Sequence, residues 1–245
     1  MSLESSGKTV EYDKLIRKRK ACRECECLGL TNQSVFAGGK YDSSEIGAWS
    51  RWQGNLNAEL MVIGQDFANK ERFETTEGLP DPNFRTNKTL VELLGRAGFD
   101  IQLPETAMQF SDKTKNRGLL FFTNAILCLK QGTAQSPVKA ECFQKCGEHF
   151  LRPLIDLVKP KVVVCLGRRA YRGVMVAYGK NPRKFRSAVD SEEPDTLPPN
   201  GISVFAVYHC GARVQNSHRS LDEQREDWTR IGNFLKKRQQ PDSAS

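Results

Sequence analysis

The sequence predicts a three-layer α/β/α sandwich with a four-stranded parallel sheet. Short apolar runs bounded by polar or turn residues alternate with longer stretches of helical periodicity. Uninterrupted apolar strands are typical of a parallel sheet covered by helices on both faces. The length of 245 residues and the hydrophobic content of 38% suit one domain. We expect this domain over 10–238, with 1–9 and 239–245 as tails.

Four apolar runs are the predicted strands. They are 59–63 (ELMVI), 119–124 (LLFFTN), 161–166 (KVVVCL) and 203–208 (SVFAVY). In such sheets, ligands bind outside the carboxyl ends of the strands. The residues just after each strand are therefore expected to carry the chemistry.

Helical stretches lie between and after these strands. The stretch 86–97 has one apolar stripe, and 168–178 follows the third strand. Pro153 is expected to kink or split a helix over 137–158, because proline lacks a backbone donor. A last helix is predicted from Ser220, where a glutamate three residues later completes a capping box. Its inward-facing residues are predicted to be Trp228, Ile231 and Leu235.

Two stretches are predicted to be irregular. One is the polar connection 67–84, and the other is 180–201, which has four prolines and mixed charge. The sequence has no glycine-rich dinucleotide loop, no phosphate-binding GxxxxGK motif and no apolar run of about 20 residues. These observations argue against nucleotide-cofactor chemistry and against a membrane partner.

Positive charge is in excess. Lysine and arginine number 37 against 29 acidic residues, for a net charge of +8. This excess favours a polyanionic partner, although solvated surface charge is the simpler explanation for any one cluster. Basic clusters include Arg168 and Arg169, which follow the third predicted strand.

The eight cysteines suggest a reducing compartment rather than a disulfide framework. The N-terminal segment lacks the apolar run of a secretory signal, so we expect a cytoplasmic monomer with reduced thiols. Cys22, Cys25 and Cys27 fall within six residues, a density typical of metal binding or redox chemistry.

Polar residues follow three of the four predicted strands. Asp66 comes after the first strand, Asn124 ends the second and His209 follows the fourth. Each has an ordinary explanation: a capping carboxylate, an amide that binds loop backbone, and a buried core histidine. Their shared position after strands indicates one site instead.

Several motifs resemble those of the uracil-DNA glycosylase superfamily. The segment GQDFANKE (64–71) resembles its first motif, and LLFFTNAILCLKQ (119–131) resembles the segment that ends in a base-reading asparagine. The segment 146–170 resembles the iron–sulfur, thermophile-type family, and FAVYHCGARVQNS (205–217) is similar to the second motif. The resemblance spans roughly 20–235. It implies a DNA glycosylase that removes uracil or a related deaminated base by hydrolysing the N-glycosidic bond.

The resemblance also implies roles for single residues. Asn124 reads the extruded base, His209 stabilises charge on the base, and Asp66 positions water and stabilises the cationic sugar. Phe84 stacks on the base, with Phe73 as the alternative. The implied substrate-binding residues are Gly64, Gln65, Phe67, Phe84 and Asn124. The implied DNA contacts are Arg168, Arg169 and Arg213, the last in a loop over 211–214.

The sequence departs from the family at two places. Phe67 and Ala68 replace a motif that begins with proline, and Cys210 replaces the proline after the histidine. Other readings therefore stay open. One alternative is a glycosylase that acts on hypoxanthine or xanthine. A second is an inactive member that binds DNA, and a third is an unrelated α/β module with a structural metal.

The family resemblance also implies a 4Fe-4S cluster. Its expected ligands are Cys22, Cys25, Cys128 and Cys146. Cys27 is an alternative to Cys25, and Cys142 is an alternative to Cys146. A zinc ion or no metal at all is the alternative to the cluster.

Overall fold

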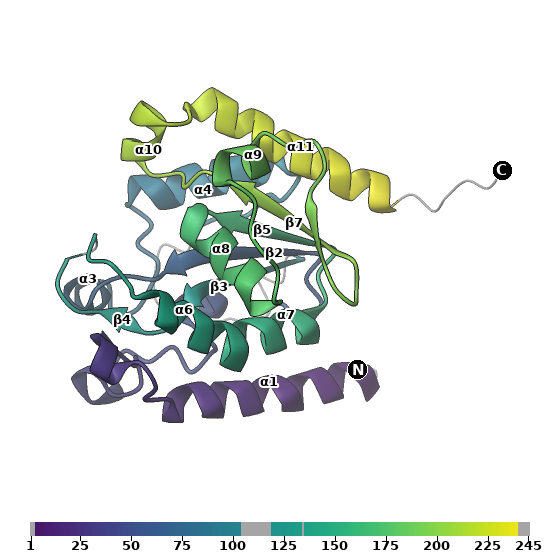
Figure 1. Ribbon diagram of the computed structural model, residues 1–245. Helices are drawn as coiled ribbons and strands as arrows, with labels where there is room; N and C mark the ends of the chain where they lie inside the picture. Colours follow the sequence, from purple (N-terminus) through teal and green to yellow (C-terminus); the bar gives the residue numbers. More distant parts are fainter. Residues whose placement is uncertain (1–2, 104–118, 134, 240–245) are drawn as a thin grey trace.

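The computed structural model describes residues 3–103, 119–133 and 135–239 and has a central sheet between layers of helices (Figure 1). Within these residues the sheet has five strands in the order β3–β2–β5–β7–β6. Their bounds are β2 (Leu60–Asp66), β3 (Leu120–Ile126), β5 (Val162–Leu166), β6 (Asp195–Leu197) and β7 (Ile202–Val207). The first four in spatial order are parallel, which confirms the predicted fold class.

The edge strand β6 corrects the predicted count of four strands. It pairs antiparallel with β7 and lies within 180–201, which the sequence predicts to be irregular. The same stretch holds the helix α9 (Phe185–Val189). In β6 only Leu197 is fully buried, so no apolar run marks this strand in the sequence. Backbone pairing with β7 stabilises β6, although its side chains do not predict a strand.

Alternate residues of the four parallel strands enter two separate cores. Met61 and Ile63 pack in one, and Leu60 and Val62 pack in the other. The first core is covered by α6 (Ala140–Cys146), η3 (Gly147–Leu151), α7 (Arg152–Val158) and α8 (Arg168–Ala177). The second is covered by α4 (Arg85–Arg96) and α11 (Leu221–Gln239). The apolar strands therefore pack against helices on both faces of the sheet, as in a three-layer sandwich.

Two predictions about helix ends are confirmed. The helical stretch before β5 is split: α6 continues into the π-helical turn η3, and Pro153 stands in the first turn of α7. At the start of α11, Ser220 N donates to Glu223 Oε2 (2.7 Å), and Glu223 N donates to Ser220 Oγ (3.3 Å). This reciprocal pair is a capping box. The three predicted inward residues of α11 are all buried.

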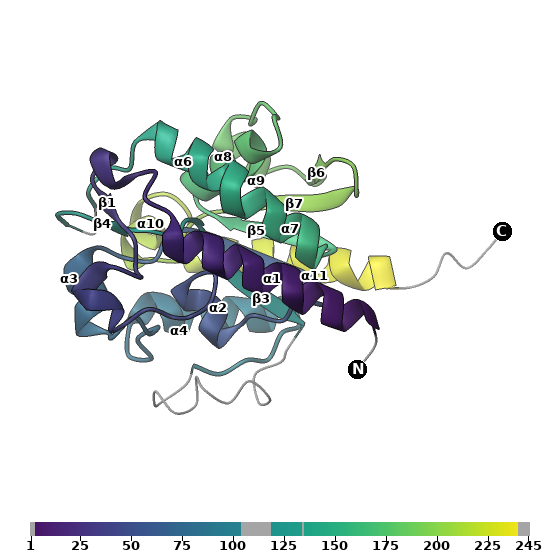
Figure 2. The ribbon, with the colours of Figure 1, turned by 90° about the horizontal axis from the view of Figure 1, so that it is seen from below.

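The helix α1 (Leu3–Ala21) is not predicted by the sequence and runs beside α7 (Figures 1 and 2). It begins within the stretch 1–9 that is expected to be a tail. Lys8 Nζ donates to Val158 O (3.2 Å) at the end of α7, and Ile46 N donates to the hydroxyl of Tyr12 (3.2 Å). These tertiary contacts hold a helix that lacks an apolar stripe. Residues 1–2 and 240–245 of the expected tails lie outside the described residues.

Several short elements complete the fold. They are η1 (Glu26–Leu28), β1 (Leu30–Thr31), η2 (Phe36–Gly39), α2 (Ala48–Trp52), α3 (Lys70–Thr75), β4 (Leu129–Lys130) and α10 (Ala212–Ser217). The helix α3 corrects the prediction that 67–84 is irregular throughout. Its N-cap is Asn69, whose side chain accepts a hydrogen bond from Arg72 N (3.2 Å). None of the described helices has the length and apolar character needed to cross a membrane.

The crossing of α11 over α4 generates a stability prediction. A Cβ on Gly232 would lie 2.8 Å from Ala97 Cα, whereas one on Gly95 of α4 would meet nothing within 4 Å. We expect Gly232→Ala to lower the free energy of unfolding by about 1–3 kcal/mol through overpacking. The matched Gly95→Ala should raise it by up to about 1 kcal/mol. Urea denaturation measures both, and equal effects would contradict the close crossing.

Candidate functional site

A cavity of about 440 Å³ lies at the carboxyl edge of the sheet. Asp66, Asn124 and His209 all line it, so the structure brings together the three strand-end residues that the sequence singles out. Gly64, Gln65, Phe67 and Phe84 line it as well. The volume is in the range of small-ligand sites.

The glycine at the end of β2 makes room for Asn124. Gly64 is the register partner of Asn124 on β3. A Cβ on Gly64 would lie only 2.4 Å from Asn124 Oδ1. Among the described residues, the buried Asn124 carboxamide has no hydrogen-bond partner. It is a free donor and acceptor facing the cavity, which is an arrangement that suits a ligand.

The Asp66 carboxylate is fixed on both sides. Lys130 Nζ lies 3.0 Å from Asp66 Oδ1, and both side chains are nearly inaccessible to solvent. The Gln65 amide donates to Asp66 Oδ2 (2.5 Å). Lys130 is a cavity-lining residue that the sequence reasoning missed. A single lysine at the end of the apolar segment LLFFTNAILCLK is the signal that could have identified it.

His209 is a neutral hydrogen-bond donor at the mouth of the cavity. Gly211 N donates to His209 Nδ1 (3.1 Å), so the neutral ring carries its proton on Nε2. Although part of the ring faces solvent, the surrounding protein displaces water and lowers the pKa of His209 from its ordinary value. The Asp66 carboxylate opposes this shift. The ring therefore presents an Nε2–H group at neutral pH.

Aromatic side chains form one wall and the rim. Phe67 lines the cavity and packs edge-on against Trp49 (6.0 Å) and Phe73 (5.6 Å between ring centroids). Phe73 is fully buried and does not line the cavity, which leaves Phe84 as the exposed ring at the rim. The Arg72 guanidinium lies 4.6 Å from the centre of the Phe84 ring.

The three arginines expected to contact DNA do not line the cavity. Arg168 and Arg169 begin α8, directly after β5, and Arg213 lies in the first turn of α10, after β7. Arg168 and Arg213 are exposed, whereas Arg169 donates to Val138 O (3.1 Å). The expected loop over 211–214 is corrected, because α10 begins at Ala212.

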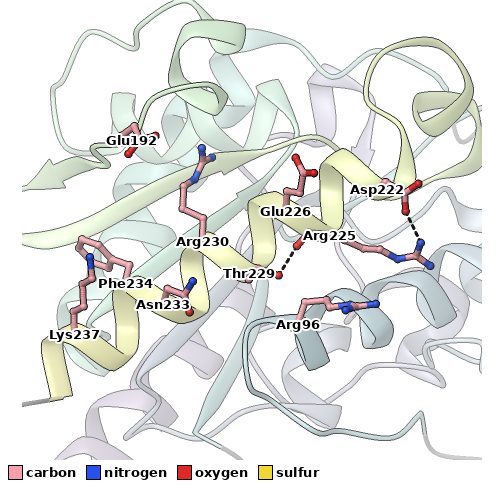
Figure 3. Close-up of a pocket in the computed structure, with 10 residues that line it drawn as sticks. All are labelled: Arg96, Glu192, Asp222, Arg225, Glu226, Thr229, Arg230, Asn233, Phe234 and Lys237. Atoms are coloured by element: carbon pink, nitrogen blue, oxygen red, sulfur yellow. Dashed lines mark hydrogen bonds and ion pairs between the residues drawn. The ribbon is translucent and has the colours of Figure 1, made fainter.

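A larger hollow of about 830 Å³ runs along α11 (Figure 3). Arg225 in its lining is already paired, with Asp222 (2.7 Å) and with Glu92 of α4 (2.6 Å). None of the strand-end residues belongs to its lining. We therefore place the candidate site in the smaller cavity, where Asp66, His209 and the unpartnered Asn124 carboxamide converge.

Four cysteines surround a third, very small cavity of about 20 Å³. They are the four expected ligands, Cys22, Cys25, Cys128 and Cys146. Of the alternatives, Cys27 is exposed and lies outside this lining. Cys142 is buried and does not line the cavity.

The four thiols are suitable ligands for a metal cluster, but the cavity between them is too small to hold one. Burial, with a smaller contribution from Cys22, raises the pKa of the Cys128 thiol to about 12. In the part of the chain that the structure describes, no three His, Cys, Asp or Glu side chains are arranged to hold a metal ion. Four thiols are suitable ligands for an iron–sulfur cluster, but the cavity has room for about one water molecule. The thiol side chains would have to turn outward to admit a cluster.

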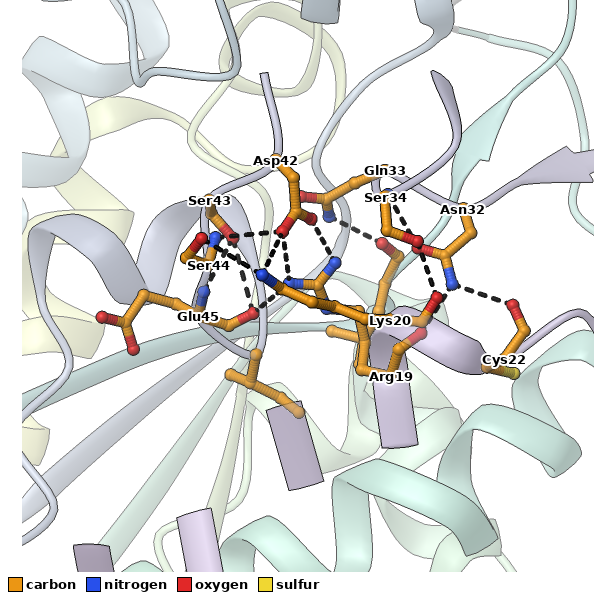
Figure 4. Close-up of polar contacts among 12 residues, drawn as sticks. Arg19, Lys20, Cys22, Asn32, Gln33, Ser34, Asp42, Ser43, Ser44 and Glu45 are labelled. Carbon is orange, nitrogen blue, oxygen red and sulfur yellow. Dashed lines mark hydrogen bonds and ion pairs between the residues drawn. The ribbon is translucent and has the colours of Figure 1, made fainter. Parts of the chain in front are cut away.

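A polar network fixes the segment that carries Cys22 and Cys25 (Figure 4). The buried guanidinium of Arg19 pairs with Asp42, and Lys20 Nζ reaches the same carboxylate (3.2 Å). The Asn32 amide donates to Arg19 O (2.6 Å) and to Cys22 O (2.8 Å). These contacts tie the end of α1 to the chain that follows and hold the first two cysteines beside β3.

Comparisons with known proteins agree with the motifs. Residues 52–232 match the family model described as the uracil DNA glycosylase superfamily. A type-5 uracil-DNA glycosylase of Pyrobaculum aerophilum is 25% identical over 215 residues, covering 85% of this chain and 86% of the relative. A type-4 uracil-DNA glycosylase of Archaeoglobus fulgidus is 23% identical over 227 residues, covering 93% and 94%.

The electrostatics of the cavity predict how His209 titrates. We expect an NMR titration of the ring protons to give a midpoint below the ordinary histidine pKa, because burial disfavours the imidazolium. The Asp66 carboxylate favours the charged ring, so Asp66→Asn should lower the midpoint further. An upward shift in Asp66→Asn would contradict the geometry.

Proposed function

The chain belongs to the uracil-DNA glycosylase superfamily, and we propose that it is a monofunctional glycosylase that hydrolyses the N-glycosidic bond of uracil, or of a related deaminated base, in DNA. The main support is the meeting of a carboxylate, a carboxamide and a neutral imidazole around one cavity. The names of the two archaeal relatives support uracil as the base.

In this proposal Asn124 reads the base. The target nucleotide leaves the helix stack, at a cost of a few kcal/mol, and its base enters the cavity. Uracil offers an acceptor at O4 and a donor at N3–H, and the carboxamide complements both. Cytosine reverses this pattern and is rejected. The lack of a partner for the Asn124 amide among the described residues and its burial support this role.

His209 and Asp66 act on the two charges that develop as the bond breaks. The bond between C1′ and N1 lengthens, the base takes the electron pair, and the sugar becomes an oxocarbenium-like cation. The His209 Nε2–H group stabilises the negative charge on the base O2, and a preorganised neutral donor suits this role. The Asp66 carboxylate stabilises the sugar and orients the water molecule that adds to C1′.

The rim of the cavity holds the extruded nucleotide and its flanking DNA. Phe84 stacks on the base, and the Arg72 guanidinium on its ring supports it. Phe67 completes the wall below. Arg168, Arg169 and Arg213 contact backbone phosphates, supported by their positions at the same edge of the sheet as the cavity.

The four cysteines around the small cavity would hold a 4Fe-4S cluster. When bound, the cluster supplies a thiolate-ligated cross-link between separate parts of the chain. Cys22 and Cys25 lie in the N-terminal segment, Cys128 lies between β3 and β4, and Cys146 ends α6. A bound cluster would therefore have a structural role, and the residues of the catalytic cavity perform the reaction.

The proposal predicts the behaviour of two variants. Asn124→Ala and His209→Ala should each lower kcat/KM for uracil excision by about 10²-fold or more, because each removes a group that binds or stabilises the reacting base. Alkaline cleavage of uracil-containing single- and double-stranded oligonucleotides measures the abasic product. Asn233→Ala, on the exposed side of α11, is the matched control and should retain full activity. Wild-type turnover in both cavity variants would refute the assignment.

The proposed cluster ligands predict different metal contents for two cysteine variants. Anaerobically purified protein should contain iron and inorganic sulfide and absorb visible light. Cys128→Ser should lose all three signals, because it removes one of the four thiols around the small cavity. Cys27→Ser should keep them, since Cys27 is exposed and lies outside the cavity. Loss in both variants, or zinc in place of iron, would contradict the ligand set.

A further inference from the structure

The wall of the catalytic cavity contains a lysine whose ammonium group is buried. Lys130 lines the same cavity as Asn124 and His209, and its side chain is only 5% exposed. Burying a lysine is costly unless its charge is paired. Its partner is the Asp66 carboxylate, at 3.0 Å. The site therefore contains a buried ion pair rather than an isolated carboxylate.

The backbone around Lys130 fixes the direction of this side chain. Lys130 ends the short strand β4, whose register pairs it with Leu30 of β1. On its other side, Lys130 N donates to Ala68 O (3.3 Å) in the loop that follows β2. The same loop leads directly from Asp66. Both partners of the ion pair are thus held by one small region of backbone pairing.

The ion pair and the Gln65 amide together define one orientation of the carboxylate. Lys130 holds Oδ1, and the Gln65 side chain holds Oδ2. The other charged pair at the cavity, Arg72 with Asp81 (2.8 Å), is already satisfied. Without Lys130, the Asp66 carboxylate would be buried with no neutralising cation. Breaking one half of a buried pair is strongly unfavourable, so the carboxylate would turn away from this position.

We propose that Lys130 is a positioning residue that holds the Asp66 carboxylate in place and aimed into the catalytic cavity. This inference rests on the proposed glycosylase function. The pair has no net charge, so the carboxylate does not repel the phosphates that flank the extruded nucleotide. With Lys130 beside it, the buried Asp66 carboxylate can stabilise the cationic sugar in the transition state. The site can still bind DNA, which is a polyanion.

A double-mutant cycle tests this role. Lys130→Met should lower kcat for uracil excision on the order of 10²-fold, because a small misplacement of a catalytic group has an effect of that size. Lys130→Arg, which keeps the charge, should retain much more activity. In an Asp66→Asn background, Lys130→Met should cause little further loss, since Lys130 acts through Asp66. Single-turnover assays with excess enzyme keep the slow variants measurable.

The matched control is Lys161→Met. Lys161 pairs with Glu59 (2.6 Å) where β5 and β2 begin, at the end of the sheet away from the cavity. It should leave kcat unchanged. The proposal is overturned if Lys130→Met is as active as wild type, or if its loss is equally large in the Asp66→Asn background. The latter result would mean that Lys130 acts on the substrate directly.

Urea denaturation separates this inference from the proposed function. The proteins measured are the wild type, Lys130→Met, Asp66→Asn and the double variant. The effects of Lys130→Met and Asp66→Asn on the free energy of unfolding should be non-additive, whether or not the protein excises uracil. A wild-type protein that fails to excise uracil refutes the function and leaves the coupling measurable. Additive effects on unfolding would refute the ion pair itself.

Discussion

The register between β2 and β3 is the constraint on which the rest of the site depends. It places Gly64 opposite Asn124, and the missing side chain of the glycine leaves space for the carboxamide. A shift of one residue would turn every side chain of the strand to the other face of the sheet. Both cores would then be lost, so the hydrophobic packing that stabilises the sheet also fixes the position of Asn124.

The surroundings of each polar group of the cavity determine its chemical character. His209 stays neutral because protein replaces water around its ring, and Gly211 directs its proton to Nε2. Asp66 is held by a different interaction, because Lys130 Nζ lies 3.0 Å from its carboxylate. A neutral donor and an anion at the same cavity match the two opposite charges that glycosidic bond cleavage creates.

Two residues that depart from the family motifs, Phe67 and Cys210, are both packed against neighbouring side chains or backbone. Phe67 joins an aromatic cluster with Trp49 and Phe73, so the loop after β2 is held by ring contacts where a proline is usual. Cys210 is buried, and its thiol donates to Thr86 O (3.5 Å) at the start of α4. Burial raises the pKa of this thiol to about 12, which makes it a structural group rather than a nucleophile.

The sequence alone determined the elements whose information is local. The apolar runs of β2, β3, β5 and β7, the capping box at Ser220 and the break at Pro153 each follow from residues close together in the chain. The position of Asp66, Asn124 and His209 near the carboxyl ends of strands also follows from the sequence, because parallel strands end at one edge. Only the tertiary structure decided features that depend on distant contacts. These are the polar helix α1, the edge strand β6, and the meeting of Lys130 with Asp66 across 64 positions of sequence. No local pattern encodes these features, since their stability comes from partners that folding alone brings together.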